Sequence, residues 1–220
     1  MASPVRQHRA VPSTVLTVCI GNICRSPLAE QLLRAQLEQS GLKDFEFFSA
    51  GLQAVVGAPM EPWPAALSRE YGGVPDGAVG KQIIEEIVGA SDLILTMTLK
   101  QREELLKRYP SAAQRTFTLA EFARIITALP EAEAASVPWG STASSSGPAS
   151  AVSPLVSMAT QARHLGRLSS SDDVPDPIGK EESVHRQVGE QIRGLTNEIA
   201  KAFSLRLGDS DGRSNGGEAR

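Results

Sequence analysis

The chain has 220 residues, of which 41% are hydrophobic, and this is enough for one domain with a full core. Its net charge of −3 does not favour nucleic acid as a partner, and no apolar stretch approaches the roughly 18 residues that a membrane span needs. The mildly basic residues 1–14 lead into no apolar segment of signal length, and the two cysteines exclude a disulfide framework. We therefore expect a cytoplasmic monomer with neither a nucleic-acid nor a membrane partner.

The most informative segment follows the first predicted strand, at 15–20, and leads into a helical pattern at 26–39. It contains, in order, Cys19, Ile20, Gly21, Asn22, Ile23, Cys24, Arg25, Ser26 and Pro27. A loop between a strand and a helix N-terminus binds anions, because backbone N–H groups converge there and the helix dipole favours negative charge. Ser26 suits the N-cap of the helix, and Pro27 suits its first position. The pattern therefore predicts an anion-binding loop with Cys19 at its base.

Cys19 and Arg25 carry the chemistry that we expect of this loop. A helix N-terminus and a nearby guanidinium favour the thiolate form of a cysteine, which is its nucleophilic form. The planar guanidinium of Arg25 can hold two oxygens of a phosphoryl group. The alternative for Cys19 is a small buried side chain at the end of a strand. A zinc site is not expected, because the sequence has no second pair of Cys or His at ligand spacing.

The rest of the chain alternates between predicted strands and helices, which indicates a parallel sheet with helices on both faces. Further strands are predicted at 45–49, 93–97 and 115–119. Further helices are predicted at 62–71, at 83–88 and at 98–107, the last starting from a capping box of Thr98 and Gln101. Another helix should follow the strand at 115–119 and end at Leu129, and the last should span 182–207. We expect an α/β fold, a small doubly wound sheet of four parallel strands, with the phosphate loop after the first strand. The ligand site should lie beyond the carboxyl ends of the strands.

Residues 18–30 resemble the phosphate loop of the low-molecular-weight protein tyrosine phosphatases, which reads Cys-x-Gly-Asn-x-Cys-Arg-Ser-Pro. The other similar segments are 48–51, 92–98 and 174–177, and the whole resemblance covers roughly 15–129 and 172–207. The chain is similar to the bacterial type, with an insertion before the loop that carries the general acid. The family's His before the third strand, which supports the phosphate loop, is replaced here near Ala78.

The resemblance implies a protein-tyrosine phosphatase that works through a phosphocysteine intermediate. Cys19 would attack phosphorus, Arg25 would stabilise the equatorial oxygens, and Asp176 would protonate the leaving oxygen. The remaining loop residues would bind phosphate or support the loop, and they are Ile20, Gly21, Asn22, Ile23, Cys24 and Ser26. Ser26 would hydrogen-bond Cys19, and Cys24 would form a reversible disulfide with it under oxidation. The resemblance implies no metal or organic cofactor. It implies a phosphotyrosine-containing protein as partner, a tyrosine kinase being one candidate.

The choice of Asp176 as the acid needs a reason, because Asp172 and Asp173 lie close to it in the sequence. Pro175 and Pro177 restrict the backbone on both sides of Asp176. This suits a group that must meet a leaving oxygen at hydrogen-bond distance. The resemblance also selects the Asp that precedes Pro177. The alternative is that all three acids are solvated surface charges.

Residues 131–171 depart from the family pattern. The stretch 136–153 is mostly Ser, Ala, Gly and Pro, which predicts a flexible linker. A short helix is predicted at 153–165, and its side chains that could dock on the domain are Leu155, Met158 and Leu165. The insertion is either a lid over the site or a passive surface loop. We expect a single phosphatase domain at 14–207, with disordered segments at 1–13 and 208–220.

Several residues bear on the substrate. Ile178 follows the Asp-Pro pair where the family's tyrosine phosphatases have an aromatic residue, and Leu52, Val55 and Val56 offer an aliphatic slot. Ile23 matches the tyrosine-specific pattern, whereas relatives that act on phosphoarginine have Thr there. The alternatives are a phosphoarginine phosphatase, an arsenate reductase coupled to a small thiol, and a non-catalytic phosphate-binding or redox-sensing module. A thioredoxin-coupled reductase is excluded, because it needs two further cysteines.

Overall fold

The computed structural model describes residues 11–130, 150–163 and 173–208. Four strands form one parallel sheet in the order β2-β1-β3-β4. These strands are β1 (Ser13–Cys19), β2 (Phe45–Gly51), β3 (Leu93–Thr96) and β4 (Thr116–Thr118). The predicted α/β fold with four parallel strands is confirmed.

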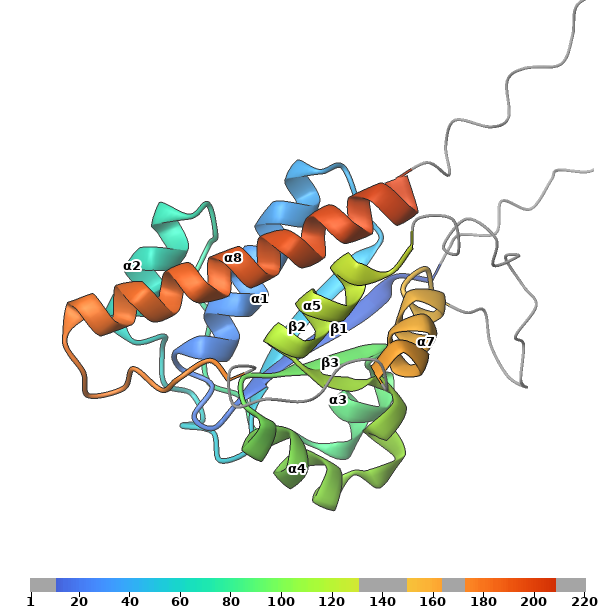
Figure 1. Cartoon of the computed structure of the whole chain (residues 1–220). Coiled ribbons are helices and arrows are strands. Elements are labelled where there is room, and N and C mark those ends of the chain that lie inside the picture. Colours follow the sequence, from blue (N-terminus) through green and yellow to red (C-terminus); the bar gives the residue numbers. More distant parts are fainter. Residues whose placement is uncertain (1–10, 131–149, 164–172, 209–220) are drawn as a thin grey trace, which may run out of the picture.

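Helices cover both faces of the sheet (Figure 1). On one face lie α1 (Arg25–Gln39), α2 (Pro62–Glu70), α5 (Leu119–Ala128) and the long α8 (Glu182–Leu207). On the other face lie α3 (Glu85–Ala90), α4 (Leu99–Arg108) and the 3₁₀ helix η1 (Pro110–Arg115). Helix α7 (Ser153–Ala162), from the insertion, lies at one end of the sheet. The predicted arrangement of helices on both faces is therefore confirmed.

Strand β1 is buried on both faces, as expected of a central strand in a parallel sheet. Val15 packs in the larger hydrophobic core together with Phe117. Leu16 and Val18 pack in a smaller core on the other face. Burial on both faces explains why this strand reads as a continuous apolar run. It places Cys19, the last residue of β1, at the carboxyl end of the sheet.

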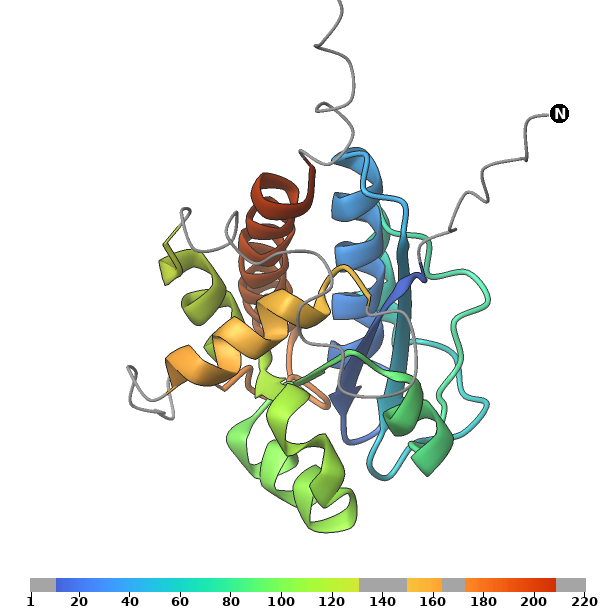
Figure 2. The same cartoon turned by 90° about the vertical axis from the view of Figure 1, so that its right-hand side faces the viewer.

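The described part of the insertion, 150–163, packs against the amino end of the sheet, opposite to the end at which Cys19 lies. Leu155 is buried in the larger core, and Met158 packs against it. The backbone N–H of Val152 donates to Ser13 Oγ at 3.1 Å, at the first residue of β1. Figure 2 looks onto this end of the sheet and shows α7 lying across it. The docking predicted for Leu155 and Met158 is confirmed, whereas Leu165 lies outside the described residues.

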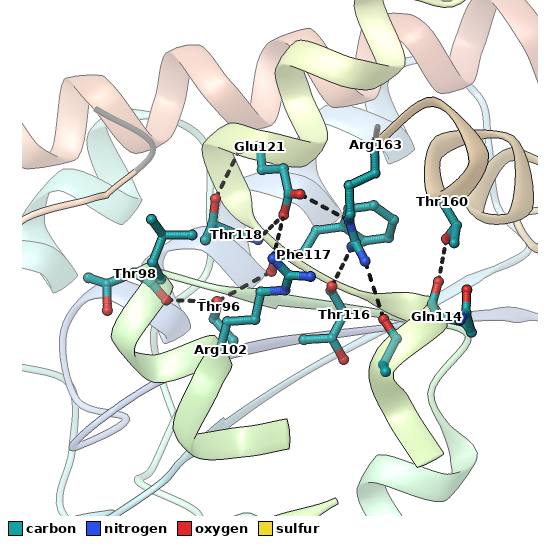
Figure 3. A network of polar contacts seen from close by, with 12 residues as sticks. Thr96, Thr98, Arg102, Gln114, Thr116, Phe117, Thr118, Glu121, Thr160 and Arg163 are labelled. Carbon is teal, nitrogen blue, oxygen red and sulfur yellow. Dashed lines mark hydrogen bonds and ion pairs between the residues drawn. The ribbon is translucent and has the colours of Figure 1, made fainter. Parts of the chain in front are cut away.

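Arg163, directly after α7, ties this helix to the domain (Figure 3). Its Nη2 donates to the carbonyl of Thr116 at 2.6 Å, and its Nε donates to Glu121 Oε1 at 3.0 Å. Its guanidinium lies 4.0 Å from the centre of the Phe117 ring. Glu121 is fully buried, and a buried carboxylate needs such partners. Because Thr116 begins β4, this network fixes α7 at the amino ends of the strands, so that α7 is no lid over the Cys19 loop.

Parts of the predicted domain organisation lie outside the described residues. They include most of the predicted flexible linker and nearly all of both predicted disordered ends. Ser13, which was expected in the N-terminal extension, is the first residue of β1, where its N–H donates to the carbonyl of Asp44 at 2.8 Å. In the portion that the structure describes, no helix combines the length and apolar character needed to cross a membrane.

Candidate active site

The loop that joins β1 to α1 has its carbonyl groups bound by the segment that follows β2. The donor and acceptor pairs, at 2.8–3.0 Å, are Leu52 N with Cys19 O, Gln53 N with Ile20 O, Val55 N with Gly21 O, and Glu61 N with Ile23 O. In a trans peptide the C=O and the following N–H point in opposite directions. The N–H groups that follow these carbonyls therefore point away from this segment, and that of Asn22 donates to the Cys19 sulfur. An anion-binding cradle needs this arrangement.

Asn22 holds the loop in its shape. Its φ is 55°, a left-handed value that Asn adopts more readily than most residues. Its Nδ2 donates to Ser26 Oγ at 2.9 Å, and its Oδ1 accepts from the backbone N–H of Lys81 at 2.8 Å. The backbone of Lys81 thus supports the loop, although no family-type His stands near Ala78. A backbone donor has no signature in a sequence, and so this contact could not be predicted.

Ser26 contacts the sulfur of Cys19. The Sγ and Oγ atoms share a hydrogen bond at 2.9 Å, and the backbone N–H of Asn22 donates to the same sulfur at 3.3 Å. The predicted role of Ser26 as the N-cap of α1 is wrong, because the N-cap is Cys24 and Ser26 is the second helical residue. Its hydroxyl is used by Cys19 and Asn22 instead.

Arg25, the first residue of α1, is almost completely buried, with 3% of its surface exposed. Its Nη1 donates to the carbonyl of Val174 at 3.0 Å, and its Nη2 pairs with Asp176 Oδ2 at 2.8 Å. Its Nε is buried and has no hydrogen-bond partner among the described residues. A buried donor without a partner costs free energy. This N–H is therefore available to an anion held in the loop.

Asp176 lies between Pro175 and Pro177, in the stretch that precedes α8. Its side chain is 49% exposed, and one of its oxygens contacts Arg25. The backbone N–H of Ile178 donates to its other oxygen at 3.3 Å. The structure thus brings the carboxylate of Asp176 to the guanidinium at the edge of the phosphate loop.

The neighbouring acids differ from Asp176. Asp173 Oδ1 accepts from the backbone N–H of Leu99 at 2.7 Å, at the start of α4. Asp172 lies outside the described residues. Of the two described acids in this stretch, Asp176 is therefore the one directed toward Arg25.

Cys24 is the other cysteine of the loop, and it is buried. Burial, and then the charge of Cys19, raise the pKa of the Cys24 thiol to about 12. Cys24 is therefore protonated at neutral pH, whereas a nucleophilic cysteine acts as the thiolate. Cys19 is the cysteine whose sulfur accepts a backbone N–H.

Aliphatic side chains are exposed in the two segments that contact the loop and Asp176. Val55, whose N–H binds the loop, is 49% exposed, Val56 is 70% exposed, and Ile178 is 44% exposed. Leu52, which was expected to line the same slot, is buried in the smaller core instead. Within 11–130, 150–163 and 173–208, no cluster of three or more His, Cys, Asp or Glu side chains is placed to hold a metal ion.

The parallel sheet, the loop at the carboxyl end of β1, and the places of Cys19 and Arg25 at the two ends of that loop are typical of a cysteine-containing phosphate-loop protein. Residues 14–130 match the model of one family of this class, described as low molecular weight phosphotyrosine protein phosphatase. The chain belongs to this family. The matched residues end before Asp176, so the assignment of Asp176 depends on its geometry.

Relatives and solved structures agree with this family. The probable low molecular weight protein-tyrosine-phosphatase EpsP of Ralstonia solanacearum is 37% identical over 108 residues, which are 49% of this chain and 71% of that protein. A protein-arginine-phosphatase of Geobacillus stearothermophilus is 32% identical over 112 residues, which are 51% of this chain and 72% of that protein. The crystal structure of a low molecular weight protein tyrosine phosphatase from T. tengcongensis is similar with a TM-score of 0.62 at 27% identity, and the similarity covers 86% of this chain and 98% of that one.

Proposed function

We propose that this chain hydrolyses phosphotyrosine on proteins through a phosphocysteine intermediate. The main support is that one loop carries the sulfur of Cys19 and the guanidinium of Arg25, whose Nε has no partner among the described residues, and that the carboxylate of Asp176 contacts this guanidinium. Hydrolysis of a phosphate ester by this route needs a nucleophile, a donor to the equatorial oxygens and an acid for the leaving oxygen. The similarity to relatives named as protein-tyrosine-phosphatases supports the choice of substrate.

In the first step, the Cys19 thiolate attacks phosphorus in line, and the S–P bond forms as the bond to the leaving oxygen breaks. The loop N–H groups and Arg25 stabilise the equatorial oxygens. Without substrate, one arm of the Arg25 guanidinium pairs with Asp176 at 2.8 Å. When substrate is bound, Nη2 and Nε of Arg25 donate to the phosphoryl oxygens, and Nη2 no longer pairs with Asp176. Asp176, released from this ion pair, takes up a proton from solvent and gives it to the departing oxygen.

In the second step, water attacks phosphorus and the S–P bond breaks. Asp176, now a carboxylate, accepts a proton from this water. The sulfur of Cys19 leaves as a thiolate, and the Ser26 hydroxyl at 2.9 Å and the Asn22 N–H at 3.3 Å stabilise its charge. Ser26 and Asn22 therefore support the step that releases phosphate.

Phosphotyrosine is favoured over phosphoarginine by Ile23, which is the residue type of the tyrosine-specific pattern. Phosphoarginine is the second candidate, because a protein-arginine-phosphatase is among the relatives. An aromatic side chain stacked on the phenyl ring of the substrate would add roughly 0.5–1.5 kcal/mol of binding free energy. Val55 and Ile178 are aliphatic and lack this contribution, so we expect the phenyl ring to bind only moderately. We also propose a monomeric cytoplasmic enzyme whose partner is a phosphotyrosine-containing protein, with a tyrosine kinase as one candidate.

The test measures hydrolysis of two peptides, one carrying phosphotyrosine and one carrying phosphoarginine. Each peptide is tested with the unmodified chain and with the matched variant Ile23→Thr. For the unmodified chain, we expect kcat/KM to be at least about tenfold higher for phosphotyrosine than for phosphoarginine. In Ile23→Thr, we expect the ratio of these two kcat/KM values to be smaller. Faster hydrolysis of phosphoarginine by the unmodified chain would contradict the proposed substrate. Arsenate-dependent oxidation of a small thiol without ester hydrolysis would indicate a reductase, and phosphate binding without any turnover would indicate a binding module.

We further propose that Cys24 protects Cys19 from irreversible oxidation. Peroxide oxidises the Cys19 thiolate to a sulfenic acid, and the sulfur of Cys24 then forms the disulfide as water leaves. Because the pKa of Cys24 is about 12, its thiolate fraction is small at neutral pH and increases with pH. Burial, the largest cause of the raised pKa, persists after Cys19 is oxidised, although the charge of Cys19 is then lost, so the rate of disulfide closure should rise as the pH rises above neutrality.

This prediction is checked by peroxide treatment, alkylation and peptide mapping at several pH values. Wild-type enzyme should recover its activity with a thiol reductant, whereas Cys24→Ser should lose it permanently through further oxidation of Cys19. If Cys24→Ser recovers as completely as wild type, Cys24 has a structural role only.

A further inference from the structure

The loop that carries Asp176 is held by Arg25, which binds Val174 and Asp176, and by contacts of the residues that precede Pro175. Pro175 and Pro177 have no N–H to donate, and Asp176 itself is half exposed. Upstream, the N–H of buried Val174 donates to the carbonyl of Met97 at 2.7 Å, just after the end of β3. The place of the Asp176 carboxylate therefore depends on its pair with Arg25 and on how the segment before Pro175 is anchored.

Asp173 provides a second anchor in this segment. Its Oδ1 accepts from the N–H of Leu99, the first residue of α4, at 2.7 Å. Its carbonyl accepts from Gln191 Nε2 of α8 at 3.2 Å. The N–H of Leu99 is one of the donors that a helix N-terminus leaves without an internal partner, and the helix dipole favours a carboxylate there. The side chain of Asp173 thus joins the acid loop to α4.

Helix α4 has a fixed place relative to Cys19. It begins shortly after β3, where the N–H of Met97 donates to the carbonyl of Val18 in β1 at 3.1 Å. Arg102 of α4 also pairs with buried Glu121 at 3.6 Å (Figure 3). Through its bond to Leu99, Asp173 therefore fixes the acid loop relative to the strand that ends at Cys19.

We propose that Asp173 is a positioning residue for the general acid, because its bond to the N-terminus of α4 holds Asp176 where it can meet the leaving oxygen. This inference rests on the proposed function, since it takes Asp176 as the acid. Small displacements of a catalytic group lower the rate even in an intact fold. Loss of the Asp173 side chain should therefore weaken proton donation and leave attack by Cys19 and anion binding unchanged.

The test measures kcat/KM for two esters, phenyl phosphate with a poor leaving group and 4-nitrophenyl phosphate with a better one. We expect Asp173→Ala to lower kcat/KM about tenfold for phenyl phosphate and less than about threefold for 4-nitrophenyl phosphate, because only the first ester depends strongly on the acid. Asp173→Asn keeps an oxygen that can accept from Leu99, and it should retain most of the activity on phenyl phosphate. The alkaline side of the profile of kcat/KM against pH should flatten in Asp173→Ala and should keep its wild-type shape in Asp173→Asn.

Thr98→Ala is the matched control, because Thr98 Oγ1 caps the same helix by accepting from the N–H of Gln101 at 3.2 Å, a hydrogen bond at the start of α4 that does not involve the acid loop. It should affect both esters equally, and urea unfolding of each variant measures any loss of folded enzyme. An equal loss for both esters in Asp173→Ala, no loss, or a selective loss in Thr98→Ala would overturn the proposal. A wild-type chain that hydrolyses neither ester would refute the proposed function instead, before any variant is compared.

Discussion

Replacing Cys19 with Ser should abolish phosphate ester hydrolysis, with kcat reduced by more than about 10⁴-fold. A serine hydroxyl at this position has no strong base beside it, since its neighbours are the Ser26 hydroxyl and the N–H of Asn22. The anion should still bind, because the loop N–H groups and the Nε of Arg25 are unchanged. We expect the dissociation constant of inorganic phosphate, measured by calorimetry, to stay within about threefold of wild type.

Cys24→Ser is the control for this prediction, because Cys24 is the other buried cysteine of the loop. It should keep most of the wild-type kcat under reducing conditions. Residual hydrolysis by Cys19→Ser above a small fraction of the wild-type rate would show that another group is the nucleophile.

Replacing Asp176 with Asn should lower kcat/KM for a phosphotyrosine peptide by about 10²–10³-fold. An acid matters most when the leaving group is poor, so an aryl phosphate with an acidic phenol should lose far less. The alkaline side of the pH–rate profile should also flatten, because the group whose proton is needed has been removed. The measurement is kcat/KM against pH for both substrates.

Asp172→Asn is the matched control, since it changes a neighbouring acid in the same way. It should leave kcat/KM within about twofold of wild type. An unchanged rate in Asp176→Asn, together with the selective loss in Asp172→Asn or Asp173→Asn, would show that the general acid is assigned to the wrong residue.

The sheet and the phosphate loop could be predicted because their signals are local. The apolar run of β1, the Gly and Asn of the loop and the following helical pattern lie in one short segment of the chain. The order of elements then determines a parallel sheet, and the loop falls at its carboxyl end. For the same reason the sequence alone allows Cys19 to be proposed as the nucleophile and Arg25 as its partner in binding phosphate.

Other contacts could not be predicted, because their partners are distant in the sequence or belong to the backbone. The N-cap preference of Ser26 was overridden by tertiary contacts, since its hydroxyl binds the Cys19 sulfur and Asn22. Lys81 supports the loop through its N–H alone. Arg163 fixes α7 at the amino ends of the strands through Thr116 and Glu121 (Figure 3), and no pattern near Arg163 indicates those partners.

The stretch before α8 shows the same limit. From the sequence, Asp172, Asp173 and Asp176 are three neighbouring carboxylates that only the flanking prolines distinguish. In the structure, Asp173 binds the N-terminus of α4 and Asp176 binds Arg25, so that two similar residues have different partners. Asp173 and Asp176 have different partners because α1 and α4 each bring a different group to this stretch of chain. The residues of the stretch itself do not indicate where those helices lie.

The most direct test of the central claim is to trap the covalent intermediate. Asp176→Asn should form phosphocysteine readily from 4-nitrophenyl phosphate, which needs little acid catalysis, and should hydrolyse it slowly, because the base for the water is lost. Rapid denaturation during turnover, followed by peptide mapping with mass spectrometry, locates the phosphate. We predict phosphate bound to the sulfur of Cys19. Turnover with no phosphate on the protein, or with phosphate on another residue, would contradict the mechanism.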